Sequence, residues 1–526
     1  MRMNNGYWWM MAVVAMVVSA GGAEERRVSL AGEWGFKLDA GKVGVEEKWF
    51  ARQLGGKIKL PGSTDEAGVG ERNVKAANYD GLSRVWVYVG GAWYQREVEV
   101  PAAWAGKRVA LFLERCHWES RVWVDEKEVG MRDSLCVAHE YDLSGVMTAG
   151  RHRVTVRVDN SQKYNMGPDA HSTSEQTQTN WNGIVGKIEL RATDPVWIES
   201  VQVYPNVEKK TAKVKVVIGN ATGKAVEGTW AFNVHRRGST NLAQVMPLKF
   251  EAAEGERVAQ EWDLTVGEDM KLWDEFSPAM YDVDADLMTK VGEAKYADVR
   301  ETSFGMRKLA VEGRQFAVNG RATFLRGTLD CCIYPLTGYA PMDVEGWRRV
   351  FKVVRDYGLN HVRYHSWCPP EAAFEAADEA GILLHVEAPQ WAFDVGKDAK
   401  RDAFIEAEVR RILDVYGNHP SFGMLCMGNE LSGELGFLSK LVKFGQQHDG
   451  RHLYTSSTGW SFVPENDYTV AQVRGIRGPG TEHDFRVEDA KLRSPVVSHE
   501  IAQWTVYPNL EEIKKYTGVT RARNFE

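Results

Sequence analysis

The sequence predicts a multidomain protein in which two β-sandwich domains precede a (β/α)8 barrel. Its 526 residues allow about three domains. Up to residue 303, short runs alternate apolar and polar residues between turn signals, and from residue 304 strands alternate with helices. The predicted divisions are a signal peptide (1–23), a jelly-roll-like β-sandwich (27–195), an immunoglobulin-like β-sandwich (196–303) and the barrel (304–526).

Composition excludes several classes of protein. Hydrophobic residues make up 44% and charged residues 26%, which is ordinary for a globular chain and excludes a disordered or polytopic membrane protein. Lys and Arg number 65 against 72 Asp and Glu, a net charge of −7, so we expect no nucleic-acid partner. The 19 tryptophans indicate core packing, or stacking against sugar rings.

The N-terminus has the pattern of a secretory signal. Arg2 precedes an apolar stretch at 7–18, and small residues follow at 19–23. The stretch is short for a bilayer span, although a membrane anchor is the alternative. We therefore expect a periplasmic or secreted protein without stable membrane insertion after cleavage. The six cysteines form no CxxC pair and no zinc spacing.

The two sandwiches are predicted from alternation. Residues 151–158 alternate polar and apolar side chains, and 109–113 and 121–125 are further β-rich runs. In the second domain, 230–234 and 281–287 alternate in the same way. Each set is separated by turn residues, and the length of the second suits a small immunoglobulin-like fold.

The barrel is predicted from regular strand–helix units. Asp343 caps a helix that Gly358 ends, Gly381 ends a second helix, and Tyr416 lies on the apolar face of a third. Apolar strands between such helices indicate a parallel sheet. The expected strands are 323–328, 359–364, 382–386, 421–427, 453–456, 468–473 and 495–498. No eighth strand is visible, and 520–526 resembles the first turns of a helix, so we expect either an open barrel or, preferably, a chain truncated before strand eight.

Polar residues follow the expected strands, where barrels carry their chemistry. A single charge at a strand end is usually a salt-bridge member, but several on one rim indicate a site. Glu430 and Glu500 follow strands four and seven, on opposite sides of the barrel. Two facing carboxylates can cleave a glycosidic bond, one as proton donor and one as nucleophile.

Several motifs together resemble glycoside hydrolase family 2, the family of β-galactosidases, β-glucuronidases and β-mannosidases. The resemblance runs from about Leu30 to the end of the chain, and its most specific part is Asn418–Ser421 leading to Gly428-Asn429-Glu430. The other matching segments are 32–36, 60–62, 92–96, 181–186, 304–307, 318–320 and 325–327. It implies that the first sandwich is a sugar-binding domain.

The resemblance also implies residue roles. Glu430 would be the acid/base, Glu500 the nucleophile, and Asn429 would bind the sugar 2-hydroxyl. Arg363 would hold Glu500 ionised. Further pocket residues would be Asp330, His365 and Glu387, with Trp391 and Trp504 stacking on sugar unless they pack in the core.

The sequence departs from the family at two informative places. Leu425-Cys426-Met427 precede Gly428 where the family often has Trp-Ser, and 389–392 offers neither the acidic residue nor the histidine of the metal-binding members. We therefore expect no cofactor and no metal. His499-Glu500 is not a zinc motif, because Gln503 stands where HExxH needs its second histidine.

These observations predict an exported, retaining exo-β-glycosidase with a carbohydrate substrate, β-galactosidase-like in type. A β-glucuronidase or β-mannosidase is the alternative within the family. A carbohydrate-binding protein without turnover is the alternative outside it, because an incomplete barrel would lose one side of its pocket. The sequence is compatible with a homo-oligomer.

Overall fold

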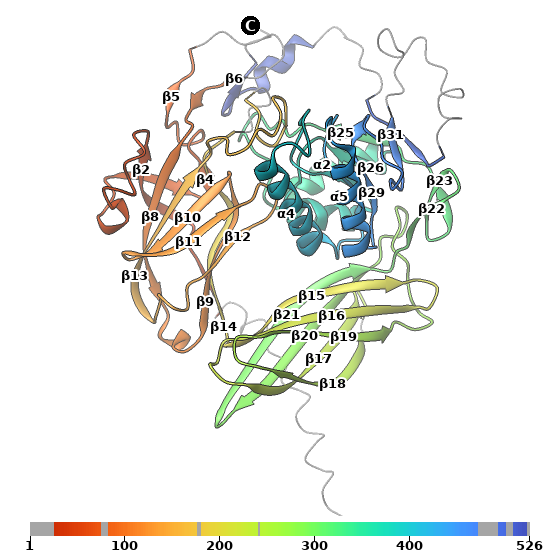
Figure 1. Ribbon diagram of the computed structural model, residues 1–526, viewed down its shortest axis with the longest axis horizontal. Helices are drawn as coiled ribbons and strands as arrows, with labels where there is room; N and C mark the ends of the chain where they lie inside the picture. Colours follow the sequence, from red (N-terminus) through yellow and green to blue (C-terminus); the bar gives the residue numbers. More distant parts are fainter. Residues whose placement is uncertain are drawn as a thin grey trace, which may run out of the picture.

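The computed structural model describes residues 26–74, 83–175, 180–239, 242–471, 493–500 and 509–522. The predicted signal peptide and Trp504 lie outside these residues. Two β-sandwiches and a region of parallel strands with helices are visible in Figure 1, with the first sandwich beside the helical region and the second below both. In the described part of the chain, we find no helix with the length and apolarity that a bilayer crossing requires.

The first sandwich has two facing antiparallel sheets. The 151–158 alternation forms β13, which pairs with β8 and β10 at the centre of one sheet. Its inward side chains Val154, Val156 and Val158 are fully buried against the other sheet. The sheet orders are β11-β10-β13-β8-β2-β3 and β1-β14-β9-β12, with β4 on β14. The strands are β1 Arg27–Ser29, β2 Gly32–Asp39, β3 Gly56–Leu60, β4 Gly62–Ser63, β8 Gly91–Val100, β9 Arg108–Cys116, β10 Glu119–Val124, β11 Lys127–Asp133, β12 His139–Asp142, β13 Gly150–Asp159 and β14 Gly183–Thr193.

The second sandwich is smaller and also antiparallel. The alternating residues Trp230, Phe232 and Val234 lie in β17 and are buried between its sheets. The sheets have the orders β15-β16-β19 and β18-β17-β20-β21. Their strands are β15 Val196–Asn206, β16 Thr211–Asn220, β17 Val226–Arg236, β18 Leu242–Ala252, β19 Arg257–Thr265, β20 Met280–Val291 and β21 Ala294–Gly305.

The region after the second sandwich begins with a small antiparallel sheet. Its strands are β22 Leu309–Glu312, β23 Gln315–Val318 and β24 Arg321–Thr323. The prediction of a first barrel strand at 323–328 was therefore wrong in position, because Phe324 is exposed between β24 and the first parallel strand. That strand is β25, Gly327–Asp330, which begins and ends later than the predicted 323–328.

Parallel strands and helices alternate from β25 to β29, as predicted. The Asp343 carboxylate accepts a hydrogen bond from the amide of Gly346 and so caps α2. Gly381 ends α3 in a left-handed conformation. The elements are α2 Val344–Asp356, β26 His361–Tyr364, α3 Glu371–Ala380, β27 Leu383–Glu387, α4 Ala399–Tyr416, β28 Phe422–Cys426, α5 Leu435–His448, β29 Leu453–Thr455, β30 Thr458–Gly459, β31 Thr469–Ala471 and β32 Val496–Ser498.

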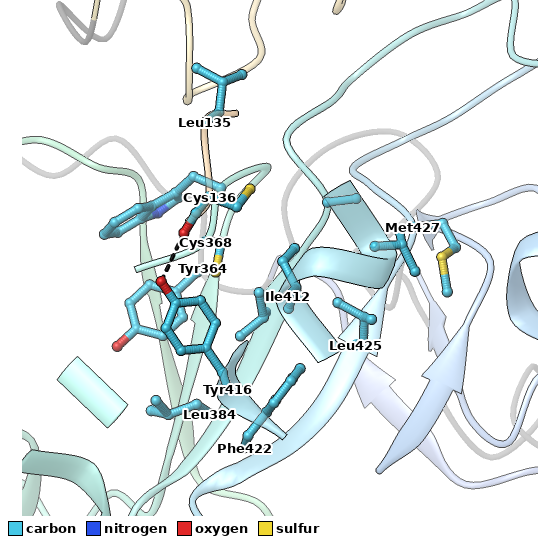
Figure 2. Close-up of a cluster of buried hydrophobic side chains, with 14 of the residues drawn as sticks. Leu135, Cys136, Tyr364, Cys368, Leu384, Ile412, Tyr416, Phe422, Leu425 and Met427 are labelled. Atoms are coloured by element: carbon cyan, nitrogen blue, oxygen red, sulfur yellow. Dashed lines mark hydrogen bonds between the residues drawn. The ribbon is translucent and has the colours of Figure 1, made fainter. Parts of the chain in front are cut away.

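The core between helices and sheet reaches into the first sandwich. Figure 2 shows Tyr416 of α4 among Leu384, Phe422 and Leu425 of the parallel sheet. The Tyr416 hydroxyl donates a 2.8 Å hydrogen bond to the carbonyl of Cys136, which belongs to the sandwich. The two domains thus share one apolar core, which fixes the sandwich against the parallel sheet.

The parallel strands form two sheets in the described residues. One is β25-β26-β27-β28-β29 and the other is β30-β31-β32. A closed (β/α)8 barrel therefore stays a prediction. The expected helix at 520–526 was wrong at its start, because Thr520 and Arg521 form the short strand β33, which pairs with β6 (Ser83–Arg84) of the first sandwich. A contact across more than four hundred residues left no local signal.

Candidate active site

The carboxyl ends of β25, β26, β28 and β32 place polar side chains at one edge of the parallel region. The site residues predicted from separate strands are joined there by direct contacts. Arg363 binds both Glu387 and Asn429, and His365 reaches Glu500. Trp504 lies outside the described residues, so its place is not assigned.

Arg363 is the centre of this network. Its Nε donates to Oε1 of Glu387 at 2.6 Å, and its Nη2 donates to Oδ1 of Asn429 at 2.6 Å. Nη2 also donates to the Thr458 hydroxyl at 2.8 Å, and Nη1 to the carbonyl of His499 at 3.2 Å. The planar guanidinium therefore ties together β26, β27, β28 and the end of β32, with a geometry that an ammonium cannot reproduce.

The turn after β28 contains two residues, Gly428 and Glu430, with positive φ. Gly428 has φ +143°, and a Cβ there would stand 2.6 Å from the carbonyl oxygen of Gln390. Glu430 is itself left-handed, with φ 44°, and its amide donates to the carbonyl of Thr458 at 2.9 Å. Such a conformation is costly for glutamate and is concentrated at functional sites. The fold thus fixes the backbone from which the Glu430 side chain extends.

The orientation of the Asn429 amide follows from its neighbours. Its Oδ1 accepts hydrogen bonds from Arg363, from the Thr458 hydroxyl at 2.8 Å and from Nε2 of His499 at 3.1 Å. All three are donors in this arrangement, so the oxygen and nitrogen of the amide are distinguished. The Nδ2 group is buried and has no hydrogen-bond partner among the described residues, which leaves one donor for a bound molecule.

The imidazole of His499 lies between the two predicted catalytic carboxylates. Its Nδ1 is 3.9 Å from Oε1 of Glu430, and its Nε2 is 3.5 Å from Oε1 of Glu500. The Glu430 and Glu500 side chains keep 12% and 16% of their surface exposed, enough to be reached from outside. The structure therefore brings both carboxylates to one place.

Glu500 is held ionised. Burial by itself would raise its pKa, but the hydrogen bond from His365 and the electrostatic effects of the neighbouring His499, His365 and Arg363 outweigh it and lower the pKa to about 2. The His365 Nε2 lies 3.4 Å from Oε1 of Glu500. His365, His499 and Arg363 therefore surround Glu500, and the role predicted for Arg363 stays a prediction.

Glu387 belongs to the same hydrogen-bond network, through Arg363. Glu387 is fully buried, and its second oxygen accepts the amide of Ser366 at 2.7 Å. Its carboxylate, His385 and Cys426 place possible ligand atoms within 4.8 Å of one another. Both Glu387 oxygens are already bound to Arg363 and Ser366, so these three residues form an interior polar cluster and we assign them no metal.

Asp330 has a different environment. Its carboxylate accepts the Cys332 amide and the Tyr334 hydroxyl, each at 2.8 Å. Burial raises the pKa of Asp330 to about 6, against the opposing effect of these two hydrogen bonds. A cavity of about 50 Å³ opens beside it between the first sandwich and the parallel strands, lined among others by Cys332, Ser172 and Pro389.

Trp391 is half-buried at the same edge, with its ring 5.0 Å from that of His365 at 62°. The structure adds His171, Ser366, Thr458 and His499 to the predicted residues. His171 comes from the loop between β13 and β14 of the first sandwich, and its ring stacks on His365 with centroids 4.0 Å apart. Nothing local in the sequence marks His171 or Thr458, since their contacts depend on how distant segments dock. His499 directly precedes Glu500 after a predicted strand, so its position at a strand end could have identified it from the sequence.

Comparison with known proteins places this chain in a family. Two family models match consecutive stretches: the glycosyl hydrolases family 2 sugar binding domain over residues 28–194, and glycosyl hydrolases family 2 over residues 196–307. Together they cover more than half of the chain.

Individual relatives point the same way. A β-glucuronidase of Paenibacillus borealis is 25% identical over 436 residues, which are 76% of this chain and 67% of the relative. A dog (Canis lupus familiaris) β-glucuronidase is 23% identical over 457 residues, 77% of this chain and 63% of the relative. A β-galactosidase of Bacteroides ovatus is 25% identical over 363 residues, 65% of this chain and 40% of the relative. The chain thus spans between two fifths and two thirds of these proteins.

Among solved structures, a β-galacturonidase of Eisenbergiella tayi bound to galacturonate superposes with a TM-score of 0.72 at 17% identity, covering 92% of this chain and 82% of that one. A β-glucuronidase of Parabacteroides merdae gives 0.70 at 18% identity over 90% and 60%. At such identities the likeness shows the fold. The two family-model matches, with the order of the motifs after them, show that this chain belongs to glycoside hydrolase family 2.

Proposed function

We propose that the protein is a retaining β-glycosidase that releases terminal β-linked sugars by double displacement. The observation that carries the proposal is the position of His499, whose two ring nitrogens face the carboxylates of Glu430 and Glu500. Two carboxyl groups in different environments are what glycoside hydrolysis requires.

The environments assign the roles. Glu500, kept ionised by His365, His499 and Arg363, attacks the anomeric carbon, and the bond to the leaving oxygen breaks. Glu430 gives its proton to that oxygen. Once the leaving group has departed, Glu430 takes a proton from water, which attacks the anomeric carbon and frees the sugar from Glu500. Asn429 offers its Nδ2 to the sugar 2-hydroxyl, where a hydrogen bond strengthens in the transition state.

We propose a β-glucuronide as the first substrate to test. The β-glucuronidases among the relatives of this chain support it. The β-galactosidase-like activity expected from the sequence is the second candidate, supported by the Bacteroides ovatus relative. A panel of chromogenic aryl β-glucuronide, β-galacturonide, β-galactoside and β-mannoside separates these candidates. Binding without turnover of any of them would favour a carbohydrate-binding protein.

The nucleophile is tested by Glu500→Ala. The variant should lose turnover on an activated aryl glycoside, and added azide should restore aryl release with a glycosyl azide of inverted anomeric configuration as product. Azide replaces the missing carboxylate at the anomeric carbon. Glu511→Ala is the control, because Glu511 is an exposed acid outside the site. Retained turnover in Glu500→Ala, or loss without an azide product, would overturn the assignment.

A further inference from the structure

A chain of hydrogen bonds leads from the first sandwich to Glu500. The backbone amide of His171 donates to the Ser366 hydroxyl at 2.8 Å. The same hydroxyl lies 3.3 Å from Nδ1 of His365, and the other ring nitrogen of His365 lies 3.4 Å from Oε1 of Glu500. Three side-chain or backbone groups therefore connect a loop of another domain to the proposed nucleophile.

The donors and acceptors in this chain have a fixed direction. The His171 amide can only donate, so the Ser366 oxygen accepts from it. The Ser366 oxygen has a second lone pair, so the direction of its contact with Nδ1 of His365 depends on the imidazole. The ionised Glu500 carboxylate can only accept, so Nε2 of His365 carries a proton, and in the neutral ring Nδ1 then presents its lone pair to the Ser366 hydroxyl. A neutral imidazole that accepts at Nδ1 carries its proton at Nε2, the nitrogen that faces Glu500. The serine thus stabilises the tautomer that donates to the carboxylate.

The docking of the loop keeps this geometry in place. The Met166 carbonyl accepts the amide of Trp391 at 2.7 Å, and the Ser172 hydroxyl donates to the carbonyl of Pro389 at 3.3 Å. Burial and the neighbouring His365 and Arg363 lower the pKa of His171 to about 2, so the His171 ring that stacks on His365 is a neutral imidazole.

The backbone at Ser366 is also constrained. Ser366 is fully buried with φ 52°, and its amide donates to Glu387. This left-handed conformation aims the hydroxyl at its two partners and is maintained by the surrounding contacts.

We propose that Ser366, held by the sandwich loop at His171, is a positioning residue that sets the His365 tautomer and so directs a proton to Glu500. This inference rests on the proposed function, because it gives Glu500 the role of nucleophile. If so, the first sandwich contributes to positioning the nucleophile, in addition to any role in binding sugar.

The kinetic test compares Ser366→Ala with Ser134→Ala. Both remove one buried hydroxyl from a contact between the first sandwich and the parallel region, but the Ser134 hydroxyl binds Glu408 and does not touch His365. In Ser366→Ala we expect kcat/KM to fall about tenfold or more, the effect of one hydrogen bond of about 1.4 kcal/mol. We also expect the acid limb of the pH profile of kcat/KM to move to higher pH, because Glu500 loses a donor while His499, Arg363, His171 and Cys331 still face the cluster. Ser134→Ala should leave both kcat/KM and the acid limb unchanged.

A loss in Ser366→Ala without movement of the acid limb would mean a merely structural role and would overturn the proposal. So would equal behaviour of the two variants. If Glu500→Ala fails to yield the azide product, the proposed function fails instead, which separates the two outcomes.

A second measurement does not depend on turnover. Imidazole nitrogen NMR on the protein labelled at its 13 histidines, with the His365 signal assigned by its loss in His365→Gln, reports the tautomer directly. We expect a neutral ring with the proton at Nε2 in the wild type and a mixed population in Ser366→Ala. A wild-type proton at Nδ1, or an imidazolium at neutral pH, would overturn the proposal.

Discussion

The guanidinium of Arg363 donates from Nη2 to Oδ1 of Asn429 over 2.6 Å. This bond, with those from Thr458 and His499, occupies the amide oxygen of Asn429 and leaves its buried Nδ2 as an unused donor. The two residues come from β26 and from the turn after β28, two strands away in the sheet, and their pairing determines which end of the amide is left for a substrate.

Asn429→Ala should lower kcat/KM about a hundredfold on the preferred glycoside, since a hydrogen bond to the 2-hydroxyl contributes several kcal/mol in the transition state. The matching 2-deoxy glycoside should be cleaved equally by wild type and variant once its own slower rate is allowed for. Comparing the two substrates in both proteins measures the coupling. An equal loss on both substrates would remove Asn429 from the 2-hydroxyl contact.

Arg363→Lys should reduce kcat/KM about a hundredfold although the charge is kept, because an ammonium cannot hold Glu387, Asn429 and Thr458 at once. Arg326→Lys is the matched control. Arg326 bonds the carbonyl of Gly358 at the opposite end of the parallel strands and is partly exposed. Similar losses in the two variants would argue against a central role for Arg363.

Glu430→Ala should harm glycosides with poor leaving groups far more than dinitrophenyl glycosides, which need no proton. General acid catalysis is commonly worth about a hundred- to ten-thousandfold, and that is the expected gap. Steady-state kcat/KM across a series of aryl leaving groups measures it. A uniform loss across the series would take Glu430 out of the acid role.

Asp330→Asn should change how stability depends on pH. The pKa of Asp330 is raised by burial from its ordinary 3.8 to about 6, so the folded protein holds this proton more tightly than the unfolded chain. The stabilisation is complete below pH 3.8 and is lost as the pH rises through about 6. The Tm of the wild type should therefore gain on that of the variant as pH falls through this window. A constant Tm difference would contradict the prediction.

Glu408→Ala tests the joint between the domains. The buried Glu408 carboxylate of α4 accepts the Ser134 hydroxyl and the amides of Leu135 and Cys136 from the first sandwich. Losing it leaves these donors unsatisfied, and we expect a free energy of unfolding lower by about 2–5 kcal/mol.

Glu406→Ala provides the control for Glu408. Glu406 lies on the same helix and pairs with Lys440 near the surface, so its loss should cost under about 1 kcal/mol. Urea unfolding followed by tryptophan fluorescence measures both variants. Equal effects would show that the joint does not depend on the buried carboxylate.

The sequence alone predicted most of the strands and helices, and several of the polar residues at the carboxyl ends of the parallel strands. Alternation placed the strands of both sandwiches, and Asp343 and Gly381 marked the ends of helices that the structure contains. The rule that parallel strands direct their carboxyl ends to one edge brought Arg363, Asn429 and Glu500 together from far apart in the chain. These features depend on local backbone preferences and on the spacing of apolar and polar residues, and both can be recognised within short stretches of sequence.

Only the tertiary structure decided how those elements meet. In the described residues it arranged the parallel strands in two sheets, paired residues 520–521 with the first sandwich and stacked His171 on His365. It also determined that the Asn429 oxygen is occupied by three donors while its buried Nδ2 has no partner among the described residues. Each of these outcomes depends on packing between segments that are far apart in the chain. The free energy comes from burying side chains and from completing hydrogen bonds between those segments. Neither burial nor these hydrogen bonds leave a pattern in the local sequence.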